Sequence, residues 1–598
     1  MPTDISSRRK FLFSSASTAT AVALGGTLAA CGGSEDPRTA FANPPPKADF
    51  KYGVASGDPL SDRVILWTHA KIADSLAAVD LTWQVAADSA FAAVVRTGRL
   101  QATEAASFTA KVDVTGLVAG ATYYYRFVDD AGFSSPIGTT RTLPAAGASS
   151  VKLAVFSCSL YSEGFFNAYA DAAKSDAQYA IHLGDYLYEY GSDPKKFGNA
   201  DAVKLGRITL PANDMLSLSD YRARHALYKT DADLQALHAR MPWITVWDDH
   251  EFANNAYLTG AENHDSATQG DWATRKAVAA RAYHEWMPIR IDASGDPFKI
   301  YRSFHFGNLL SLHMLDTRME GRDRQYDGFG DADGGLARYA GALATGADAK
   351  RTMMSNTQQT WLTSAMAAST AAWQFLGNQD IMARMWFPAT VLQSYAAAAT
   401  NPAGVGTAIG AFLSAKATLA MAGATALTPT QAGLLNTSVN PRLPYNLDAW
   451  DGYPSQRESI LQSAKAQGKK LVALSGDSHN AWFASLTTLN GEKVGVEFAT
   501  PSVTAPGFES VGLGAMASSL DGSALVPQLG VAAIGAGLGL VDDLGWCDTN
   551  RRGYLLMTVS SSAVKGEFVF VSTVKSPTFS AAVGKAISVS SAGAVSYA

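Results

Sequence analysis

The chain has 598 residues, of which 47% are hydrophobic and 17% are charged, so it is long and apolar enough to bury a large core. Its formal net charge of −5 at pH 7 excludes the strongly basic surface that nucleic-acid-binding proteins use. The three cysteines, Cys31, Cys158 and Cys547, exclude a framework of several disulfides.

The N-terminus has the pattern of an export signal. Ser7–Leu12 reads SRRKFL, a twin-arginine pattern, and the stretch after it is too polar for a good membrane span. That stretch ends in LAAC at Leu28–Cys31, which favours lipidation of Cys31; the alternative is an ordinary cleavage that discards this cysteine. We therefore predict a twin-arginine signal peptide with a lipobox at 1–31 and a Pro-rich tether at 32–47. The twin-arginine machinery would export the chain to the periplasm or beyond, with a lipid anchor at Cys31.

Residues 48–145 have the pattern of an all-β domain. Short alternating runs such as DRVILWTHA and ATYYYRFVD are separated by turn residues, which predicts strands at short spacing. We expect this region to form a small β-sandwich of the fibronectin III type, with 142–150 as the linker to the rest of the chain.

Residues 150–575 alternate strand-like and helix-like segments, which favours an α/β or α+β core. Helices are expected at 220–241 and 272–287. The stretch 389–437 differs, because it is rich in alanine, threonine and glycine and is nearly uncharged. It predicts an insertion of small helices. Two roles stay open: packing on the core alone, or covering the site as a lid that meets a membrane or a lipid substrate.

Short polar clusters follow four apolar, strand-like runs that lie far apart in the chain. Ligands bind outside the carboxyl ends of strands in open α/β sheets. Four such ends with metal-type side chains therefore predict one shared metal site. In chain order, the clusters contain Cys158, Asp185 with Tyr188, Asp249 with His250, and Asp477 with His479.

Each cluster also has a purely structural interpretation when it is taken alone. Asp185 could cap a helix, Asp477 could close an Asx-turn, and Cys158 could be a small buried hydrophobe. In contrast, the adjacent carboxylates of Asp248 and Asp249 repel each other and are costly to gather unless a cation compensates them. Joint occurrence at four strand ends favours the metal site.

Two other classes of enzyme are disfavoured because the sequence lacks their characteristic motifs. The sequence has no Gly-x-Ser-x-Gly motif, which excludes a nucleophile elbow of the α/β-hydrolase type. It also has no Gly-x-x-x-x-Gly-Lys-Ser/Thr motif, which argues against a nucleotide-binding P-loop.

The motif order resembles a known family. Cys158, Gly-Asp-x-x-Tyr, Asp-Asp-His-Glu and Gly-Asp-x-His are similar to the calcineurin-like metallophosphoesterase pattern as modified in PhoD-type alkaline phosphatases. The opening FKYGVASGDP, the run SDYRARHALYKTDADLQALHARMPWITVWDDHE, TPSVTAPG and the closing RGYLLMTV extend the resemblance to nearly everything after the tether. It implies an N-terminal β-sandwich followed, at 150–575, by a catalytic domain with a metallophosphoesterase-type α/β/β/α core of two sheets.

The resemblance also implies a mixed centre of Fe(III) and Ca²⁺. The implied iron ligands are Cys158, Asp185, Tyr188 and His479, and the implied calcium ligands are Asp185, Asp249 and Asp477. This division makes chemical sense, because hard oxygen ligands suit calcium and softer ligands suit transition metals.

Three further residues would act on the substrate according to the resemblance. His250 would face the phosphoryl group or the leaving oxygen, and Arg318 and Asn378 would contact the phosphate. Family members commonly extend the Asp-Thr-Arg motif with Tyr and Arg, whereas this chain continues with Met319 and Glu320.

The function implied is that of an exported, metal-dependent phosphomonoesterase or phosphodiesterase. A metal-bound hydroxide would attack phosphorus in line with the leaving alcohol, whose oxygen a cation or His250 would stabilise. The enzymatic alternative is a phospholipase D-like phosphodiesterase, because related sequences include such activity and the neutral stretch 389–437 could contact lipid. An alternative of another class is a non-catalytic, calcium-stabilised surface-binding protein, which predicts calcium without iron.

Overall fold

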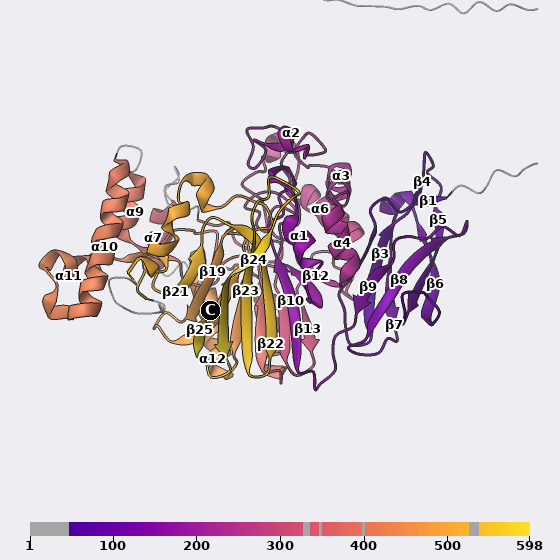
Figure 1. The fold of residues 1–598 in the computed structure, drawn as a ribbon. Helices are drawn as coiled ribbons and strands as arrows, with labels where there is room; N and C mark the ends of the chain where they lie inside the picture. Colours follow the sequence, from indigo (N-terminus) through magenta and orange to yellow (C-terminus); the bar gives the residue numbers. More distant parts are fainter. Residues whose placement is uncertain (1–46, 327–334, 346–349, 398–400, 526–536) are drawn as a thin grey trace, which may run out of the picture. The chain divides into compact units, whose positions relative to one another are not determined.

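The computed structural model describes residues 47–326, 335–345, 350–397, 401–525 and 537–598 (Figure 1). The predicted signal peptide and the predicted tether, apart from Lys47, lie outside these residues. The described part contains helices and mixed sheets, so the prediction of an α/β or α+β chain is confirmed at this level.

The larger sheet has ten strands among the described residues. In spatial order they are β25 (Val595–Tyr597), β24 (Ala581–Ser590), β23 (Ala563–Val571), β22 (Arg552–Ser560), β10 (Ser150–Phe156), β11 (Tyr179–His182), β12 (Trp243–Thr245), β2 (Val54–Gly57), β3 (Arg63–His69) and β7 (Thr109–Thr115). The central strands β10, β11 and β12 run parallel and are almost wholly buried, as apolar runs without polar alternation are expected to be. Their carboxyl ends therefore lie at one edge of the sheet.

The smaller sheet has seven strands among the described residues. In spatial order they are β13 (Arg302–Phe306), β14 (Leu310–Met314), β15 (Trp373–Gly377), β18 (Leu471–Ser475), β20 (Lys493–Ala499), β19 (Ala481–Thr487) and β21 (Leu544–Asp548). Strands β14, β15, β18 and β20 are parallel, so this sheet also gathers several carboxyl ends at one edge.

The two sheets pack face to face over one hydrophobic core. In β18, Val472 and Leu474 belong to this shared core, whereas Leu471 and Ala473 belong to a second cluster on the other side of the strand. That alternation is the period of two that a strand with two buried faces requires. The second cluster includes residues of helices α8 (Asn356–Ala368) and α12 (Pro454–Ala466), so helices cover the outer face of the smaller sheet.

The N-terminal region contributes to two sheets. Its own sheet consists of β6 (Val94–Ala102), β5 (Val79–Ala86), β8 (Thr122–Asp129) and β9 (Gly138–Arg141), and it shares a core with β2, β3 and β7. Strand β2 also pairs with β12, at Gly57 and Trp243, so the backbone ladder of the larger sheet runs on into residues 48–145. Sequence reasoning did not foresee this junction. A Cβ atom on Gly57 would lie 2.3 Å from the carbonyl oxygen of Pro288, so glycine permits the close approach.

The predicted helix at 220–241 is two helices in the structure, α3 (Leu218–Tyr228) and α4 (Ala232–Arg240). The break occurs because the carboxylate of Asp231 accepts hydrogen bonds from the backbone N–H groups of Asp233 and Leu234 and so starts a new helix. The helix predicted at 272–287 is present as α6 (Trp272–Trp286).

The uncharged stretch forms helices α9 (Ala389–Ala396), α10 (Pro402–Ala422) and α11 (Pro429–Leu435), drawn in orange in Figure 1. In the described chain, one helical segment, Ala403–Ala422, is long and apolar enough to span a membrane by length and composition, and 28% of its most apolar window is buried. Lys416 is the charged residue of α10, and its ammonium is buried on the carboxylate of Asp542.

Candidate metal centre

The four polar clusters predicted from the sequence converge in the structure. Cys158 follows β10, Asp185 follows β11, and Asp249 follows β12, so the ends of three neighbouring parallel strands supply these side chains. Asp477 and His479 come from the facing sheet, directly after β18. Among the described residues, candidate ligand atoms lie within 4.8 Å of one another in four overlapping groups: Cys158, Asp185 and His479; Asp185, Asp249 and His250; Asp248, Asp249 and Asp477; and Asp380, Asp448 and Asp477.

Left-handed backbone conformations mark this centre. The φ angles of Cys158, Asp185, Asp477 and His479 are 60°, 54°, 55° and 62°. Residues other than glycine adopt this region rarely and at an energetic cost, and such residues cluster where function fixes the backbone. Gly184 adds a close approach, because a Cβ atom there would lie 2.4 Å from the Cβ of Asp248. The sharp turns aim the side chains of four different residues at one place.

Cys158, Tyr188, His479 and Asp185 form the part of the centre predicted to bind iron. The hydroxyl of Tyr188 lies 3.0 Å from Oδ2 of Asp185 and 3.2 Å from Nε2 of His479. Nδ1 of His479 donates to the carbonyl oxygen of Pro506 at 2.7 Å, which leaves Nε2 with its lone pair facing the cluster. Burial lowers the pKa of His479 to about 3, so the ring is neutral, as a metal ligand must be.

The carboxylates of the centre are buried and crowded. Burial raises the pKa of Asp185 well above its usual value, and the charges of Asp249 and Asp248 raise it further, although His250 opposes them. Oδ1 of Asp249 is buried and has no hydrogen-bond partner among the described residues. Such a cluster costs free energy unless a cation compensates it.

His250 is held by a residue that sequence reasoning missed. Nδ1 of His250 lies 2.6 Å from Oε2 of Glu189, and its ring lies 4.1 Å from the ring of Tyr188. Burial opposes protonation, but the charges of Asp249, Asp185 and Glu189 raise the pKa of His250 well above its usual value. These neighbouring charges favour a protonated ring that can give up a proton. A signal for Glu189 was present, because it directly follows the Gly-Asp-x-x-Tyr motif.

Arg318 is placed among carboxylates rather than at an open position. Its guanidinium is fully buried and lies 2.5 Å from Asp248, 2.9 Å from Asp448, 3.0 Å from Asp380 and 3.1 Å from Asp477. Asp380 and Asp448 were not predicted as site residues. Asp380 was visible in principle, because it follows β15 in the sequence GNQD.

Both the nitrogen and the oxygen of the Asn378 side-chain amide form hydrogen bonds within the protein. Its Nδ2 donates to the carbonyl oxygen of Leu474 at 3.0 Å, and its Oδ1 accepts from Nε1 of Trp450 at 2.9 Å. The side chain is fully buried, so in this structure it supports the ends of β15 and β18.

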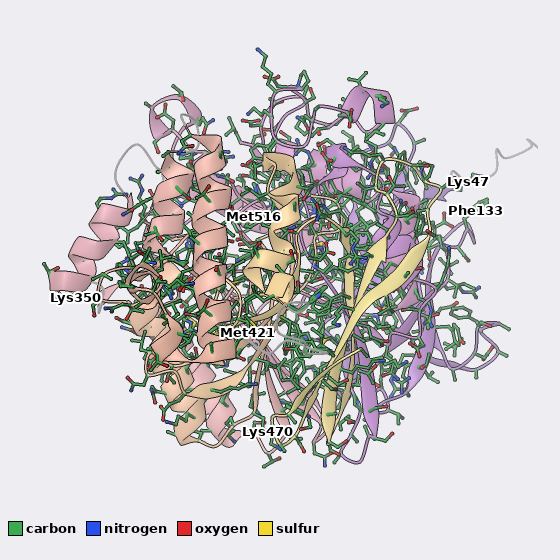
Figure 2. All side chains as sticks on the ribbon, turned by 60° about the vertical axis from the view of Figure 1, so that its left-hand side comes forward. Lys47, Phe133, Lys350, Met421, Lys470 and Met516 are labelled. Atoms are coloured by element: carbon green, nitrogen blue, oxygen red, sulfur yellow. The ribbon has the colours of Figure 1, made fainter. Side chains whose placement is uncertain are left out.

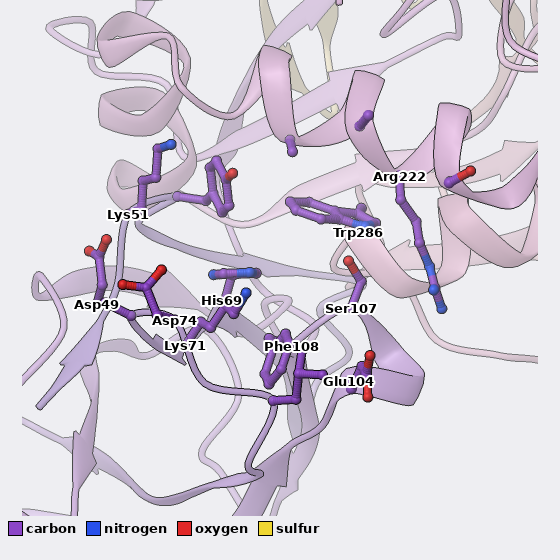
Figure 3. A pocket seen from close by; sticks show the side chains of 16 residues that line it. Asp49, Lys51, His69, Lys71, Asp74, Glu104, Ser107, Phe108, Arg222 and Trp286 are labelled. Carbon is purple, nitrogen blue, oxygen red and sulfur yellow. The ribbon is translucent and has the colours of Figure 1, made fainter. Parts of the chain in front are cut away.

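A cavity of about 610 Å³ lies away from this centre, between strands of the N-terminal region and helices α3 and α6 (Figure 3). Its lining includes His69 and Trp286, whose rings stack at 5.7 Å, and Phe108. None of the predicted site residues lines it, so cavity size alone does not locate the candidate site.

The donors of the centre fit the two cations that the resemblance implies. A thiol, a phenol and an imidazole suit a transition metal such as iron, and the surrounding carboxylate oxygens suit calcium. Oδ1 of Asp249 accepts no hydrogen bond among the described residues and has only the guanidinium of Arg318 at 3.8 Å, which is a further sign that a cation belongs there.

Comparisons with known proteins agree with this chemistry. The PhoD-like phosphatase family model matches residues 153–568, and the model of the family's N-terminal domain matches residues 36–144. Alkaline phosphatase D of Bacillus subtilis (strain 168) is 33% identical over 519 residues, which are 84% of this chain and 76% of that protein. A solved structure titled "Structure of PhoD" is 29% identical, covers 92% of each chain and superposes with a TM-score of 0.69. The predicted resemblance is confirmed: the chain belongs to the PhoD-like phosphatase family and is a hydrolase of phosphate esters.

Proposed function

We propose that the enzyme is a phosphomonoesterase or phosphodiesterase that works with Fe(III) and Ca²⁺. The observation that carries this proposal is the convergence of thiol, imidazole and carboxylate donors from four strand ends, within 4.8 Å in overlapping groups. The phenol of Tyr188 joins them, 3.0 Å from Asp185 and 3.2 Å from His479. Iron would be held by Cys158, Asp185, Tyr188 and His479, and calcium by Asp185, Asp249 and Asp477. When bound, such cations neutralise a phosphate ester and supply a hydroxide near neutral pH.

His250 would serve the leaving group. Glu189 holds Nδ1 of the ring and stabilises its protonated form, so the other nitrogen, Nε2, can carry a proton to a leaving oxygen. Tyr188 packs against the ring and limits its rotation. We therefore assign His250 as the general acid and Glu189 as the residue that positions it.

In the finer description of the fold, we propose that residues 48–145 form the fibronectin III-like sandwich. The two face-to-face sheets within 150–575 would then be the α/β/β/α core of the metallophosphoesterases. The shared core between the sheets and the helices packed outside the smaller sheet support this assignment.

The metal assignment is tested by replacing the cysteine ligand. We expect Cys158→Ser to lose bound iron and the violet to brown colour of thiolate- or phenolate-to-iron charge transfer. Because even loss of an outer-shell partner costs up to about 100-fold, hydrolysis of 4-nitrophenyl phosphate should fall by about 100-fold or more. Iron and calcium are measured by mass spectrometry of the purified protein. The matched control is Cys547→Ser, because Cys547 is also a buried cysteine and lies in β21. This variant should keep iron, colour and activity. A colourless, iron-free and fully active wild-type protein would refute the assignment.

We also propose export by the twin-arginine route and a lipid anchor at Cys31. The SRRKFL pattern at Ser7–Leu12 and the LAAC sequence at Leu28–Cys31 support this proposal. Replacing Arg8 and Arg9 with lysine should retain the protein in the cytoplasm, and Cys31→Ala should release exported protein from the membrane fraction. Detection of Cys31→Ala in the same membrane fraction as wild type would argue against the anchor.

A second candidate activity is cleavage of phospholipids in the manner of phospholipase D. It is favoured by helix α10, whose apolar surface is mostly unburied. Assays on an aryl phosphate, an aryl phosphodiester and phosphatidylcholine separate the two activities, because cleavage of the phospholipid alone would make the phosphatase proposal wrong.

A further inference from the structure

An apolar cavity of about 230 Å³ opens between the insertion and the main core. Its walls come from β16 (Trp386–Pro388), from α9, and from segments that follow β17 (Arg442–Pro444) and β20. The residues that line it are Phe387, Leu392, Tyr395, Tyr445, Phe508, Leu513 and Met516, the last of which is labelled in Figure 2. No charged side chain is among them, so the cavity is suited to an apolar group.

One wall of this cavity is fixed to the candidate metal centre. The carbonyl oxygen of Pro506 accepts the Nδ1 proton of His479 at 2.7 Å, and the backbone N–H of Phe508 donates to Oδ1 of Asn480 at 3.1 Å. The ring of Phe508 also lies 5.6 Å from that of Trp482, whose Nε1 donates to Oγ of Ser478 at 2.8 Å. The segment that presents Phe508 to the cavity is therefore pinned to the residues that directly follow Asp477.

Tyr445 connects the cavity and the centre from the other side. Its ring lies 5.5 Å from Phe387 and 5.9 Å from Phe508, both of which line the cavity. Burial raises the pKa of Tyr445, and the charges of Asp477 and Asp451 raise it further, so its hydroxyl lies within electrostatic range of both carboxylates. That hydroxyl has no hydrogen-bond partner in the part of the chain that the structure describes, which leaves it available to a ligand.

The uncharged insertion completes the cavity. Leu392 and Tyr395 of α9 line it, and the hydroxyl of Tyr395 contacts the sulfur of Met516 across it. A cavity of about 150 Å³ lined by aliphatic and aromatic side chains is enough to bind benzene. A cavity of about 230 Å³ can therefore hold one aromatic ring or a short alkyl chain.

We propose that this cavity is a substrate subsite that binds a ring-sized apolar group esterified to the phosphate. The inference rests on the proposed function, since it assigns the substrate class of the same centre. The apolar group belongs either to the ester that is retained or to the alcohol that leaves. In both cases the enzyme prefers apolar organic phosphates over small polar ones, and α9 contributes Leu392 and Tyr395 to the subsite.

The experiment fills the cavity with a larger side chain and measures how well the enzyme distinguishes substrates with an apolar ring from substrates without one. The variant is Leu513→Trp, and the control is Leu419→Trp, which places the same ring at an exposed leucine of α10. Substrates are 4-nitrophenyl phenyl phosphate and 4-nitrophenyl methyl phosphate, which share a leaving group, and glycerol 1-phosphate, whose leaving alcohol is polar. Binding of phenylphosphonate and methylphosphonate is measured separately by calorimetry, because these compounds report the subsite without turnover.

If the subsite takes the retained ester, the wild type and Leu419→Trp prefer the phenyl over the methyl diester by about tenfold in kcat/KM, and Leu513→Trp abolishes that ratio. If it takes the leaving group, Leu513→Trp lowers kcat/KM for both aryl diesters by about tenfold relative to glycerol 1-phosphate. In both cases phenylphosphonate binds the wild type more tightly than methylphosphonate does, and Leu513→Trp removes the difference.

Two results would overturn the subsite: equal binding of both phosphonates by the wild type, or an equal loss of all activities and affinities in Leu513→Trp. Failure of the proposed function has a different signature. The wild type would then discriminate between the phosphonates but hydrolyse none of the three esters.

Discussion

At the scale of single residues, the convergence of the candidate ligands was predictable because they lie shortly after the ends of apolar strands. Cys158, Asp185 and Asp477 could each have been a cap or a core residue, and only their joint position at strand ends favoured a site. Glu189 and Asp448 were missed for a physical reason. They act through tertiary contacts to His250 and Arg318. The position of Glu189 directly after Tyr188 was a signal that a carboxylate lies near the centre, but neither residue's partner is encoded by local spacing in the sequence.

Glu189 gives a prediction about pH dependence. Its carboxylate is one of the charges that raise the pKa of His250, so Glu189→Gln should lower that pKa. The protonated ring is the proposed acid, and the alkaline limb of the kcat/KM profile should therefore move to lower pH. Activity at the original optimum should fall by about tenfold or more. The measurement is a pH profile with 4-nitrophenyl phosphate.

The control for this prediction is Glu262→Gln, which removes a nearby carboxylate that accepts hydrogen bonds from Asn254 and Asn255 instead of His250. It should leave the alkaline limb in place. An unshifted limb in Glu189→Gln would contradict the role given to Glu189.

At the scale of elements, the strands of the central sheets were predicted better than the helices and the domain junction. The run WITVW gave β12 because a fully buried parallel strand needs a continuous apolar sequence. The single helix expected at 220–241 was wrong, since the capping carboxylate of Asp231 outweighs a helix-compatible pattern. The pairing of β2 with β12 could not be predicted, because strand partners distant in sequence leave no periodic signal.

The junction between β2 and β12 can be tested at Gly57. A methyl group there would meet the carbonyl oxygen of Pro288 at 2.3 Å, so Gly57→Ala should destabilise the fold by about 1–3 kcal/mol. Denaturant unfolding followed by circular dichroism measures the change. Gly410→Ala is the matched control, because Gly410 lies in α10 with nothing within 4 Å of the added atom. Gly410→Ala should stabilise the protein by about 0.5–1 kcal/mol, because alanine has a higher helix propensity than glycine. An unchanged free energy of unfolding in Gly57→Ala would contradict the close approach of β2 to Pro288.

At the scale of the whole molecule, several buried histidines are kept neutral. Burial lowers the pKa of His182 to about 3 and that of His313 to about 4. A histidine whose pKa is depressed by folding stabilises the protein above its unfolded value of about 6.5, and that contribution is lost as pH falls towards the folded value. Stability should therefore decline between pH 6.5 and 4.

His313 isolates one part of this decline. It is fully buried between Ser303 and Gln374, and its shift is equivalent to at most roughly 3 kcal/mol. His313→Gln should flatten the fall of the unfolding free energy between pH 6.5 and 4, as measured by urea unfolding at each pH. The control is His305→Gln, because His305 is exposed on the neighbouring strand β13. This variant should keep the wild-type dependence of the unfolding free energy on pH. Identical slopes in His313→Gln and the wild type would contradict the assignment.

Cys158 and His479, whose candidate ligand atoms lie within 4.8 Å of each other, are made at different times during synthesis of the chain. About 320 residues separate these two ligands, and a ribosome adds on the order of 5–20 residues per second. Roughly 15–60 s therefore pass between synthesis of the first proposed ligand of the centre and arrival of the last strand end. Throughout most of that interval Cys158 has Asp185 and Tyr188 beside it in the synthesised chain but lacks His479. Under the proposed metal assignment, iron would be loaded only after the chain has been made through His479, and the proposed twin-arginine route would then carry the folded protein.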